Sequence, residues 1–456
     1  MKKMLCIFFA FLLPTVTLVS HIPVISDYAK TVSAEDFVRK IGDMVHETDD
    51  DNLNYGASSV FEDTYRYSEY QSRRLIVKSK YKIDTSMAES YVNGYNDLWI
   101  LSYETAEKTA QAHEYYKSLK AIEYVEPDRP LYALDVDESV TLTEKEYMTW
   151  GPEYIGIDTL NNDILLSGIE LKETVVAVLD TGTDETHPDF KGRVIPTGVN
   201  TSLSGDVNSS SDDNGHGTQV AGVVIDSTLD NVIVKPYKVL DKWGQGTVIT
   251  LAAGIICAVN DGVDIINMSI SLSENSETLR EAILLADRND ILLVAASGND
   301  SSDTAYYPAS YDCVIKVGAT NEAGTIANFS TRGNDVDFAA PGVGIYTTNI
   351  GGTYKTVNGT SFSSPLVAGL AATILSYEPD LSSEDIREIL IENAVYIQET
   401  DSKIKYGNGI IRAPEFYTLS HNHEKTLAPY FSHGTAIFRE KIELEIFCDS
   451  PDSIIY

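Results

Sequence analysis

Positive charge is scarce in this chain. Its 456 residues include 34 Lys and Arg against 68 Asp and Glu, which gives a formal net charge of −34. Nucleic acid is therefore not expected as a partner, because binding it requires a basic face that neutralises phosphates. A hydrophobic content of 43% is nevertheless enough to form a large core, and it excludes a globally disordered chain. The length suits two or three domains of about 100–200 residues each.

Cysteine is almost absent, with four residues in the whole chain. Cys6 lies near the N-terminus, and Cys257, Cys313 and Cys448 are odd in number and widely spaced. This pattern excludes a disulfide framework, and the sequence contains no Cys-x-x-Cys pair for a metal site. We expect Cys257 and Cys313 to be small buried hydrophobic residues.

Long apolar runs are lacking beyond the N-terminus. Two lysines precede an apolar run over residues 4–19, which is short for a membrane-spanning helix. The pattern is typical of a secretory signal peptide within residues 1–34, cleaved after Ser20 or after Ala34. An uncleaved membrane anchor is the alternative. We therefore expect a secreted protein of bacterial type, in the extracellular space or the cell envelope, with membrane contact only if the signal stays uncleaved.

A small α+β unit is predicted at about residues 72–130, after an acidic and polar stretch. Three segments indicate strands and one has helical composition: Leu75–Val77, Leu98–Tyr103, Ile122–Pro127, and the helix Glu104–Lys120. Pro127 suits an edge strand or a strand end. Residues 128–149 are acidic and carry no pattern, so we expect a linker there.

Strands and helices then alternate as far as about residue 418. Buried strands are predicted at 174–179, 234–240, 263–268, 291–296 and 314–317, with helices at 217–225, 248–260, 277–288, 361–377 and 382–394. This alternation predicts an α/β fold with a doubly wound, mostly parallel sheet flanked by helices. Ligands in such folds bind beyond the carboxyl ends of the strands. The acidic extension 419–456 has a strand-like stretch at 442–447 and no functional interpretation.

A candidate nucleophile occurs in the stretch Asn358-Gly359-Thr360-Ser361, just before the long apolar helix. The unpaired amides and the positive dipole end of that helix favour negative charge at its first turn. Serine is a poor nucleophile unless a base takes its proton, so a histidine and an orienting acid must lie elsewhere. Taken alone, Ser361 is equally well explained as an ordinary helix cap.

Three other residues supply the chemistry that such a serine needs. Asp180 ends a predicted strand and could orient a histidine, although aspartate before a Thr-Gly pair also suits a turn. His216 lies where a helix starts, and its near-neutral reference pKa suits a proton shuttle, although a surface-loop histidine fits as well. Asn299 follows a buried strand, and its amide could donate to a developing oxyanion or simply form a turn.

Together these motifs resemble those of the subtilisin-like serine proteases, the subtilases, in which Asp, His, Asn and Ser follow one another in this order. The resemblance covers about residues 150–418 and rests on Val178-Leu179-Asp180-Thr181-Gly182, Gly215-His216-Gly217-Thr218, Ile266-Asn267-Met268-Ser269, Ala296-Ser297-Gly298-Asn299 and Gly359-Thr360-Ser361. It implies that Ser361 is the nucleophile, His216 the base and then the acid, and Asp180 its orienting group. The Asn299 amide and the Ser361 backbone N–H would form the oxyanion hole.

The resemblance also implies the residues that bind substrate. Two extended segments would pair with the substrate backbone, with a third beside the oxyanion hole: Gly244, Gln245 and Gly246; Ser269, Ile270 and Ser271; Ala296, Ser297 and Gly298. Main-chain pairing binds extended peptides with little sequence selection. The chain departs from the family pattern at Gln219, Ser271, Phe362 and Ser363. We expect activity to survive these changes, and Ser271 leaves the preference of the specificity pocket open.

The unit at 72–130 resembles the propeptide of these proteases. The implied organisation is a propeptide at 35–135, acting as intramolecular chaperone and inhibitor, and a catalytic domain at 136–418. Autocatalytic removal would cut between Tyr132 and Lys145. The implied protein is a secreted serine endopeptidase, made as a zymogen, monomeric and acting on polypeptides. A dedicated maturation protease that cleaves leaders of exported bacterial peptides is one alternative, and an inactive binding protein on a protease scaffold is another.

No metal site is expected, and no cofactor is required for the implied catalysis. Many relatives bind calcium in a loop that interrupts the helix after the catalytic histidine. Here only Asp226–Asn231 is available to turn the chain, and calcium needs 6–8 oxygen ligands at once. We expect no tight calcium site in this turn. The acidic composition leaves room for a weak structural calcium site elsewhere.

Overall fold

The computed structural model describes residues 72–416 apart from 135, 143–149, 203, 207, 334–335 and 399–400, together with 40, 70, 430–431 and 446–447. The predicted signal peptide, nearly all of residues 35–71 and most of the extension 419–456 lie outside the described residues, as do Cys6 and Cys448. Within the described parts of the chain, no helix is long and apolar enough to cross a membrane.

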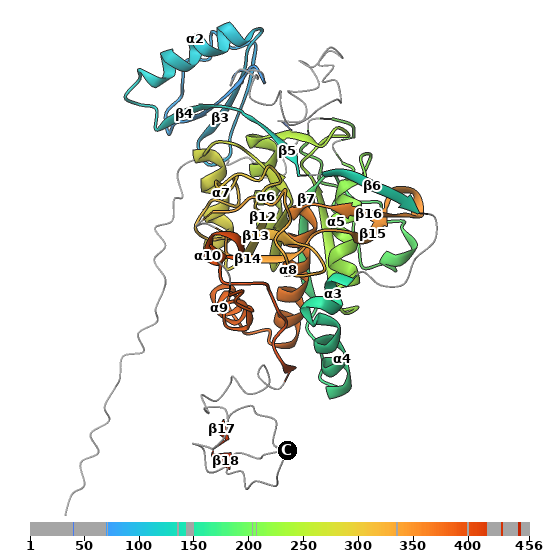
Figure 1. The fold of residues 1–456 in the computed structure, drawn as a ribbon. Helices are drawn as coiled ribbons and strands as arrows, with labels where there is room; N and C mark the ends of the chain where they lie inside the picture. Colours follow the sequence, from blue (N-terminus) through green and yellow to red (C-terminus); the bar gives the residue numbers. More distant parts are fainter. Residues whose placement is uncertain are drawn as a thin grey trace, which may run out of the picture.

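Six parallel strands form the central sheet of the larger unit (Figure 1). Their spatial order is β14-β13-β12-β10-β7-β8, and every neighbouring pair is parallel. The strands are β7 (Thr174–Asp180), β8 (Val232–Lys238), β10 (Ile265–Met268), β12 (Leu292–Ala296), β13 (Val314–Thr320) and β14 (Phe338–Pro341). The predicted α/β fold with a doubly wound, mostly parallel sheet is confirmed.

Helices cover both faces of this sheet. On one face lie α6 (Val248–Asn260) and α7 (Glu277–Arg288). On the other face lie α3 (Trp150–Ile155), α4 (Ile157–Ser167), α5 (His216–Asp226), α8 (Thr360–Tyr377) and α9 (Ser383–Asn393). A further short helix, α10, comprises Ser402–Tyr406. Alternate residues of β7 enter the two cores, because successive side chains of a strand point to opposite faces. Ala177 and Leu179 pack with α6, and Val176 and Val178 pack with α8. Continuous apolar strands follow from burial on both faces.

The smaller unit is an antiparallel sheet with the order β2-β3-β1-β4. It consists of β1 (Arg74–Lys78), β2 (Ser90–Asn93), β3 (Leu98–Ser102), α2 (Ala106–Lys117) and β4 (Tyr124–Pro127). Leu75 and Val77 belong to the unit's own core with α2, whereas Ile76 belongs to the same core cluster as α6 and α7. The unit therefore sits on these two helices (Figure 1). Pro127 lies on the edge strand β4, as predicted.

The expectation of an unpatterned linker at 128–149 is wrong for its described part, because this part contains two strands. β5 (Pro130–Ala133) lies between β9 (Gln245–Thr247) and β11 (Ile270–Ser271), antiparallel to both. β6 (Val136–Leu142) pairs antiparallel with β16 (Thr353–Asn358), whose other neighbour is β15 (Ile345–Asn349). Their hydrogen-bond partners come from distant parts of the chain. Strands of this kind leave no periodic pattern in their own residues.

The predictions for the two cysteines and for the strand-like stretch at 442–447 can be compared with the structure. Cys257 is buried in the core as expected, but Cys313 is only half-buried at its edge. Of the strand-like stretch at 442–447, the structure describes β18 (Ile446–Phe447), which pairs with β17 (Tyr430–Phe431).

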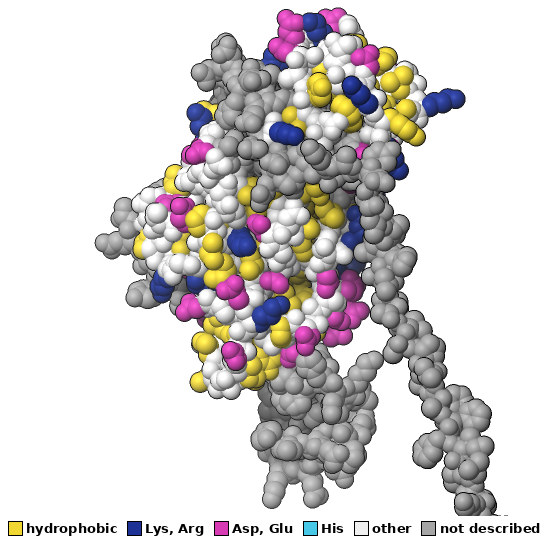
Figure 2. Space-filling model, turned by 180° about the vertical axis from the view of Figure 1, so that it is seen from behind, with side chains coloured by type: hydrophobic (Ala, Val, Ile, Leu, Met, Phe, Trp, Pro, Cys, Tyr) yellow, Lys and Arg dark blue, Asp and Glu magenta, His cyan; other side chains and the backbone are white. Residues whose placement is uncertain are grey.

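On the face shown in Figure 2, acidic side chains gather on the larger unit, whereas Lys and Arg side chains are scattered, in line with the net charge of −34.

A buried arginine closes the turn that follows α5. The Arg193 residue is 8% exposed, and burial lowers the pKa of its guanidinium. Its Nε donates to the carbonyl of Val232 (3.1 Å), and its Nη1 donates to those of Ile225 (3.0 Å) and Thr228 (3.3 Å). Nη2 donates to the Thr228 hydroxyl at 2.6 Å. The oxygens of this turn are thus bonded to a side-chain cation.

Replacing Arg193 tests whether the turn closes without a metal ion. We expect Arg193→Met to lower the free energy of unfolding by about 2–4 kcal/mol, because a buried carbonyl oxygen that loses its donor costs about 1–3 kcal/mol. The loss should be the same in calcium and in excess chelator. Chemical unfolding in a Ser361→Ala background, which lacks the candidate nucleophile, measures both.

Arg280→Met is the matched control, since the Arg280 side chain is 45% exposed and pairs with Glu277 on the surface of α7. Exposed ion pairs contribute about 0–1 kcal/mol, so this variant should unfold nearly like its parent. A calcium site occupied at 1,000 times its dissociation constant would add about 4 kcal/mol. A loss that large when chelator is added to the parent, abolished by Asp226→Ala, would contradict the prediction.

Candidate active site

The four predicted catalytic residues meet at the carboxyl ends of the parallel strands. Asp180 is the last residue of β7, Asn299 follows β12, His216 is the first residue of α5, and Ser361 lies in the first turn of α8. All four are buried, with exposed fractions of 0% for Asp180 and Ser361, 3% for His216 and 5% for Asn299. This is the end of an α/β sheet at which ligands bind.

The imidazole of His216 lies against the Asp180 carboxylate. Its Nδ1 is 2.8 Å from Oδ1 and 3.0 Å from Oδ2 of Asp180. The backbone N–H of Thr181 also donates to Asp180 Oδ1 at 2.7 Å, which holds the carboxylate in place. A carboxylate beside Nδ1 favours the tautomer with the proton on that nitrogen, so Nε2 is the basic nitrogen. The ring is thereby oriented for proton transfer at Nε2.

Asp212, which was not predicted from the sequence, connects the segments that carry Asp180 and His216. Its Oδ1 accepts hydrogen bonds from the Thr181 hydroxyl and from the backbone amides of Asn214 and Gly215, each at 2.9 Å. Its Oδ2 accepts from the backbone N–H (3.0 Å) and the hydroxyl (2.6 Å) of Thr218. The carboxylate thus joins the end of β7 to the first turn of α5. An aspartate shortly before a predicted helix start is a capping signal that could have revealed it.

The Ser361 hydroxyl donates a hydrogen bond to the backbone carbonyl of Leu134. Leu134 directly follows β5, and its own N–H donates to the Ser269 carbonyl at 3.2 Å. The Ser269 hydroxyl in turn donates to the Ser361 carbonyl at 2.9 Å. A peptide carbonyl of the protein itself therefore lies against the candidate nucleophile.

The Asn299 side-chain amide lies near the same carbonyl. Its Oδ1 accepts from the N–H (2.9 Å) and the hydroxyl (2.8 Å) of Thr360, and its Nδ2 is buried with no hydrogen-bond partner among the described residues. At Gly359 (φ +150°), an added Cβ would lie 3.2 Å from this Nδ2 and 3.4 Å from the Leu134 carbonyl oxygen. Glycine keeps open the space in which the amide and the carbonyl meet.

The strand β5 occupies two of the predicted substrate-binding segments. On one side Leu131 and Tyr132 pair with Gly246 and Gln245, and the Ala133 N–H donates to the Gly244 carbonyl at 2.8 Å. On the other side β5 pairs with Ile270 and Ser271. The arrangement is that of an extended peptide held between two strands by its backbone.

The third predicted segment, Ala296, Ser297 and Gly298, leads from β12 to Asn299 and is buried. The Gly298 N–H donates to the Thr360 hydroxyl at 3.3 Å, which links this segment to α8. An added Cβ at Gly298 (φ +126°) would lie 2.5 Å from the Thr331 hydroxyl oxygen, so only glycine fits.

The departures from the family pattern have structural partners. The Gln219 amide donates to Asn349 Oδ1 at 3.0 Å, the Phe362 ring centroid lies 5.7 Å from that of His216, and the Ser363 hydroxyl donates to the carbonyl of Ala340 at 3.0 Å. The Ser271 hydroxyl lies 3.5 Å from the Tyr132 carbonyl, next to the bound strand.

Two carboxylates of the smaller unit bind the N-terminal ends of α7 and α6. Glu126 accepts from the backbone amides of Glu277 (3.1 Å) and Thr278 (2.9 Å). Asp128 accepts from the backbone amide of Ile249 at 3.0 Å. Carboxylates are favoured at these positions by the unpaired amides and the helix dipole. They attach the smaller unit to these two helices, and β5 follows in the chain and lies between β9 and β11.

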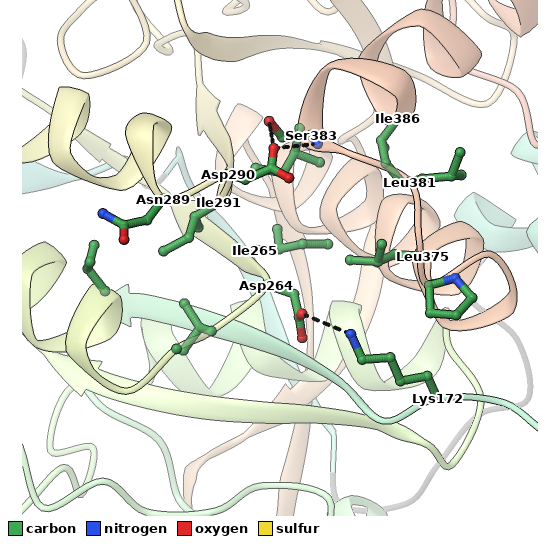
Figure 3. Close-up of a pocket in the computed structure, with 15 residues that line it drawn as sticks. Lys172, Asp264, Ile265, Asn289, Asp290, Ile291, Leu375, Leu381, Ser383 and Ile386 are labelled. Carbon is green, nitrogen blue, oxygen red and sulfur yellow. Dashed lines mark hydrogen bonds and ion pairs between the residues drawn. The ribbon is translucent and has the colours of Figure 1, made fainter. Parts of the chain in front are cut away.

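A cavity of about 320 Å³ lies at the amino ends of β10 and β12, away from Ser361 (Figure 3). Its charged groups are engaged within the fold. Asp264 lies 4.0 Å from Lys172, and Asp290 accepts from the N–H (2.9 Å) and the hydroxyl (2.8 Å) of Ser383 at the start of α9. Among the residues that the structure describes, no cluster of three or more His, Cys, Asp or Glu is placed to hold a metal ion.

The comparisons of this chain with known proteins agree on one family. The model of the subtilase family matches residues 171–409. The thermostable alkaline protease of Halalkalibacterium halodurans is 33% identical over 361 residues, which cover 76% of this chain and 92% of that protein. Subtilisin E of Bacillus subtilis is 34% identical over 326 residues, 67% of this chain and 83% of its own length. Subtilisin DY of Bacillus licheniformis is 38% identical over 269 residues, 56% of this chain and 95% of its own length.

Asp212 should act as a positioning residue. We expect Asp212→Asn to lower kcat for a peptide substrate by about tenfold to a hundredfold, because a small misplacement of reacting groups can cost about 10² in rate. KM should change little, since Asp212 touches Asp180's neighbour Thr181 and α5 rather than β5. Steady-state kinetics and thermal unfolding of the processed enzyme measure the two effects.

The matched control is Asp206→Asn, because Asp206 is exposed and also accepts from a loop amide, that of Asn208 at 3.0 Å. This variant should keep both kcat and KM. An Asp212→Asn enzyme with wild-type kcat, or one changed only in KM, would show that the carboxylate does not position the catalytic groups.

Proposed function

This chain belongs to the subtilase family and is a serine endopeptidase; from that premise we propose that it is made as a secreted zymogen that cuts polypeptides through Asp180, His216 and Ser361 and removes its own propeptide. The observation that carries the proposal is the contact between the Ser361 hydroxyl and the Leu134 carbonyl, at the end of a strand held between β9 and β11. The residues before this carbonyl are bound as a substrate would be.

The proposed reaction begins when Ser361 Oγ attacks the carbonyl carbon and His216 Nε2 takes the hydroxyl proton. The Asp180 carboxylate, 2.8 Å from Nδ1, stabilises the imidazolium that forms. The oxyanion of the tetrahedral intermediate accepts hydrogen bonds from the Asn299 amide and the Ser361 N–H. His216 then gives its proton to the leaving amine, which leaves an acyl-enzyme. Water, activated by His216 as base, hydrolyses this ester and restores the serine.

Every proton transfer and charge in this scheme is assigned to a residue of the chain, so the proposed catalysis needs no cofactor. Backbone pairing with β9 and β11 binds extended polypeptides with little selection among side chains. We propose a general endopeptidase, acting outside the cytoplasm as a monomer. A peptide library would be cut at many sites by such an enzyme. A single dominant site would instead favour a dedicated maturation protease.

We propose that the bond after Leu134 is the one first cut in the precursor. Its carbonyl lies at Ser361, and the bond falls within the predicted cleavage region between Tyr132 and Lys145. The propeptide would then end at Leu134 and the catalytic domain begin at Asp135, one residue before the boundary expected from the sequence. Glu126 and Asp128, which bind the ends of α7 and α6, support a role for the smaller unit as chaperone and inhibitor.

Ser361→Ala should leave the propeptide joined to the catalytic domain, because no nucleophile remains to cut the Leu134–Asp135 bond. Wild-type precursor should yield a protein whose N-terminus is Asp135 or lies within a few residues after it. Intact-mass spectrometry of both purified proteins reads the result directly. Normal processing of the Ser361→Ala protein would point to another protease and would contradict autocatalysis.

The Asn299→Ala variant should retain a low but measurable peptidase activity. We expect kcat to fall by about 10²–10³, the loss observed when the oxyanion-hole asparagine of subtilisin is replaced. Asn161→Ala is the control: Asn161 is also buried, and its amide donates to the Ser227 carbonyl at 3.0 Å, far from the proposed site. It should lower stability and leave kcat unchanged. Equal kcat values for wild type and Asn299→Ala would disprove the oxyanion role.

A further inference from the structure

The strand that leads to the nucleophile has a second partner that the proposed function does not explain. β16 ends at Asn358, three residues before Ser361, and β15 covers only one of its edges. The other edge is paired with β6, in a register that sets Val136 opposite Asn358 and Leu142 opposite Tyr354. The three strands therefore form one sheet with the order β15-β16-β6 (Figure 1).

The backbone groups of β16 alternate between these two neighbours. The Gly359 N–H donates to the Gly342 carbonyl at 2.8 Å, on the side of β15. In an extended strand successive residues direct their N–H and C=O groups to opposite sides, so those of Asn358, Thr356 and Tyr354 face β6. Once β6 leaves, this edge presents unpaired backbone groups, which are a template for another strand.

One continuous chain crosses the nucleophile. On its N-terminal side β5 is held between β9 and β11, and its end reaches Ser361 through the Leu134 carbonyl. On its C-terminal side β6 begins at the second residue after the Leu134–Asp135 bond and ends at Leu142, the eighth. Beyond the bond, the chain is thus paired with β16 at its second residue and again at its sixth to eighth residues.

The hairpin that carries this edge is fixed to the catalytic helix. The hydroxyls of Thr347 and Thr348 in β15 donate to the carbonyls of Gln219 and Thr218 in α5, each at 2.8 Å. The close approach needs Gly222, where an added Cβ would lie 2.2 Å from the Thr348 hydroxyl oxygen. A rigid edge loses little conformational entropy when a strand binds to it.

We propose that the edge of β16 is a binding site for the part of a polypeptide substrate that follows the cut bond, reaching about eight residues beyond it. The proposal rests on the proposed peptidase function and adds a substrate class, namely extended chains rather than short peptides. The affinity comes from backbone pairing, as in other cases of strand addition to a sheet edge. In the precursor, β6 occupies this site.

The register of β6 specifies which backbone amides of a bound chain can form hydrogen bonds with β16. Residues 137–139 stand opposite the single residue Val357, so pairing is interrupted there. Beyond this bulge Val140 lies opposite Thr356 and Leu142 opposite Tyr354, and both β16 residues face β6. The N–H groups of the sixth and eighth residues after the cut bond therefore point at β16, and that of the seventh points away.

The test compares two internally quenched peptides with the chain's own sequence, one covering residues 129–142 and one ending at residue 137. The processed enzyme should cut both at Leu134–Asp135, with kcat/KM at least about tenfold higher for the longer peptide, since each added backbone hydrogen bond contributes a factor of a few or more. N-methylation of the Val140 or the Leu142 amide should remove most of this advantage. N-methylation of the Thr141 amide is the matched control and should preserve it.

Equal kcat/KM for the long and the short peptide would overturn the proposal and leave the peptidase function standing. The same holds if the three N-methylated peptides behave alike. Failure of the proposed function looks different: neither peptide is cut and Ser361 is not labelled by a fluorophosphonate, and the extended site then falls with it.

Discussion

The backbone pairing of β5 between β9 and β11 is the interaction on which the arrangement of this protein depends. It brings the Leu134 carbonyl to Ser361, and it fixes where the following strand β6 can run. Main-chain hydrogen bonds place a peptide by its backbone geometry, so the same contacts suit the protein's own segment and an unrelated substrate. Under the proposed function, one set of bonds would serve both to inhibit the precursor and to bind a substrate.

The smaller unit, which precedes β5 in the chain, is bound to the larger unit through contacts that lie away from the proposed first cut. One face of its sheet, including Ile76 and Ile100, belongs to the same core cluster as α6 and α7. Asp128 reaches the end of α6 and is itself paired with Arg74 at 2.9 Å, both buried. Because these contacts lie away from the Leu134–Asp135 bond, cleavage alone would not release the unit. In the proposed zymogen, these contacts would keep the propeptide bound as an inhibitor after the first cut.

The proposed catalytic groups are held in place by other residues of the fold. Asp212 connects the end of β7 to the start of α5, and Thr360 orients the Asn299 amide through two hydrogen bonds. The hairpin β15–β16 is bonded to α5 by its threonines, so the hairpin that leads to Ser361 is joined directly to the helix that begins at His216. Arg193 closes the far end of α5 with a side-chain cation. The helix that carries the base is thus fixed at both ends.

The sequence by itself determined the features that local patterns encode. Apolar strands buried on both faces predicted the parallel sheet, and α7 has the predicted bounds of residues 277–288, because a capping serine and an amphipathic pattern define it. Asp180, His216, Asn299 and Ser361 could be chosen because they lie in motifs that together resemble those of the subtilases, each after a predicted strand or at the start of a predicted helix. Only the tertiary structure decided that residues 130–133 and 136–142 are strands, that Asp212 and Arg193 hold α5, and that Leu134 lies at the nucleophile. These depend on hydrogen bonds between segments more than a hundred residues apart, or on the course of a loop, and such partners leave no periodic signal in the sequence.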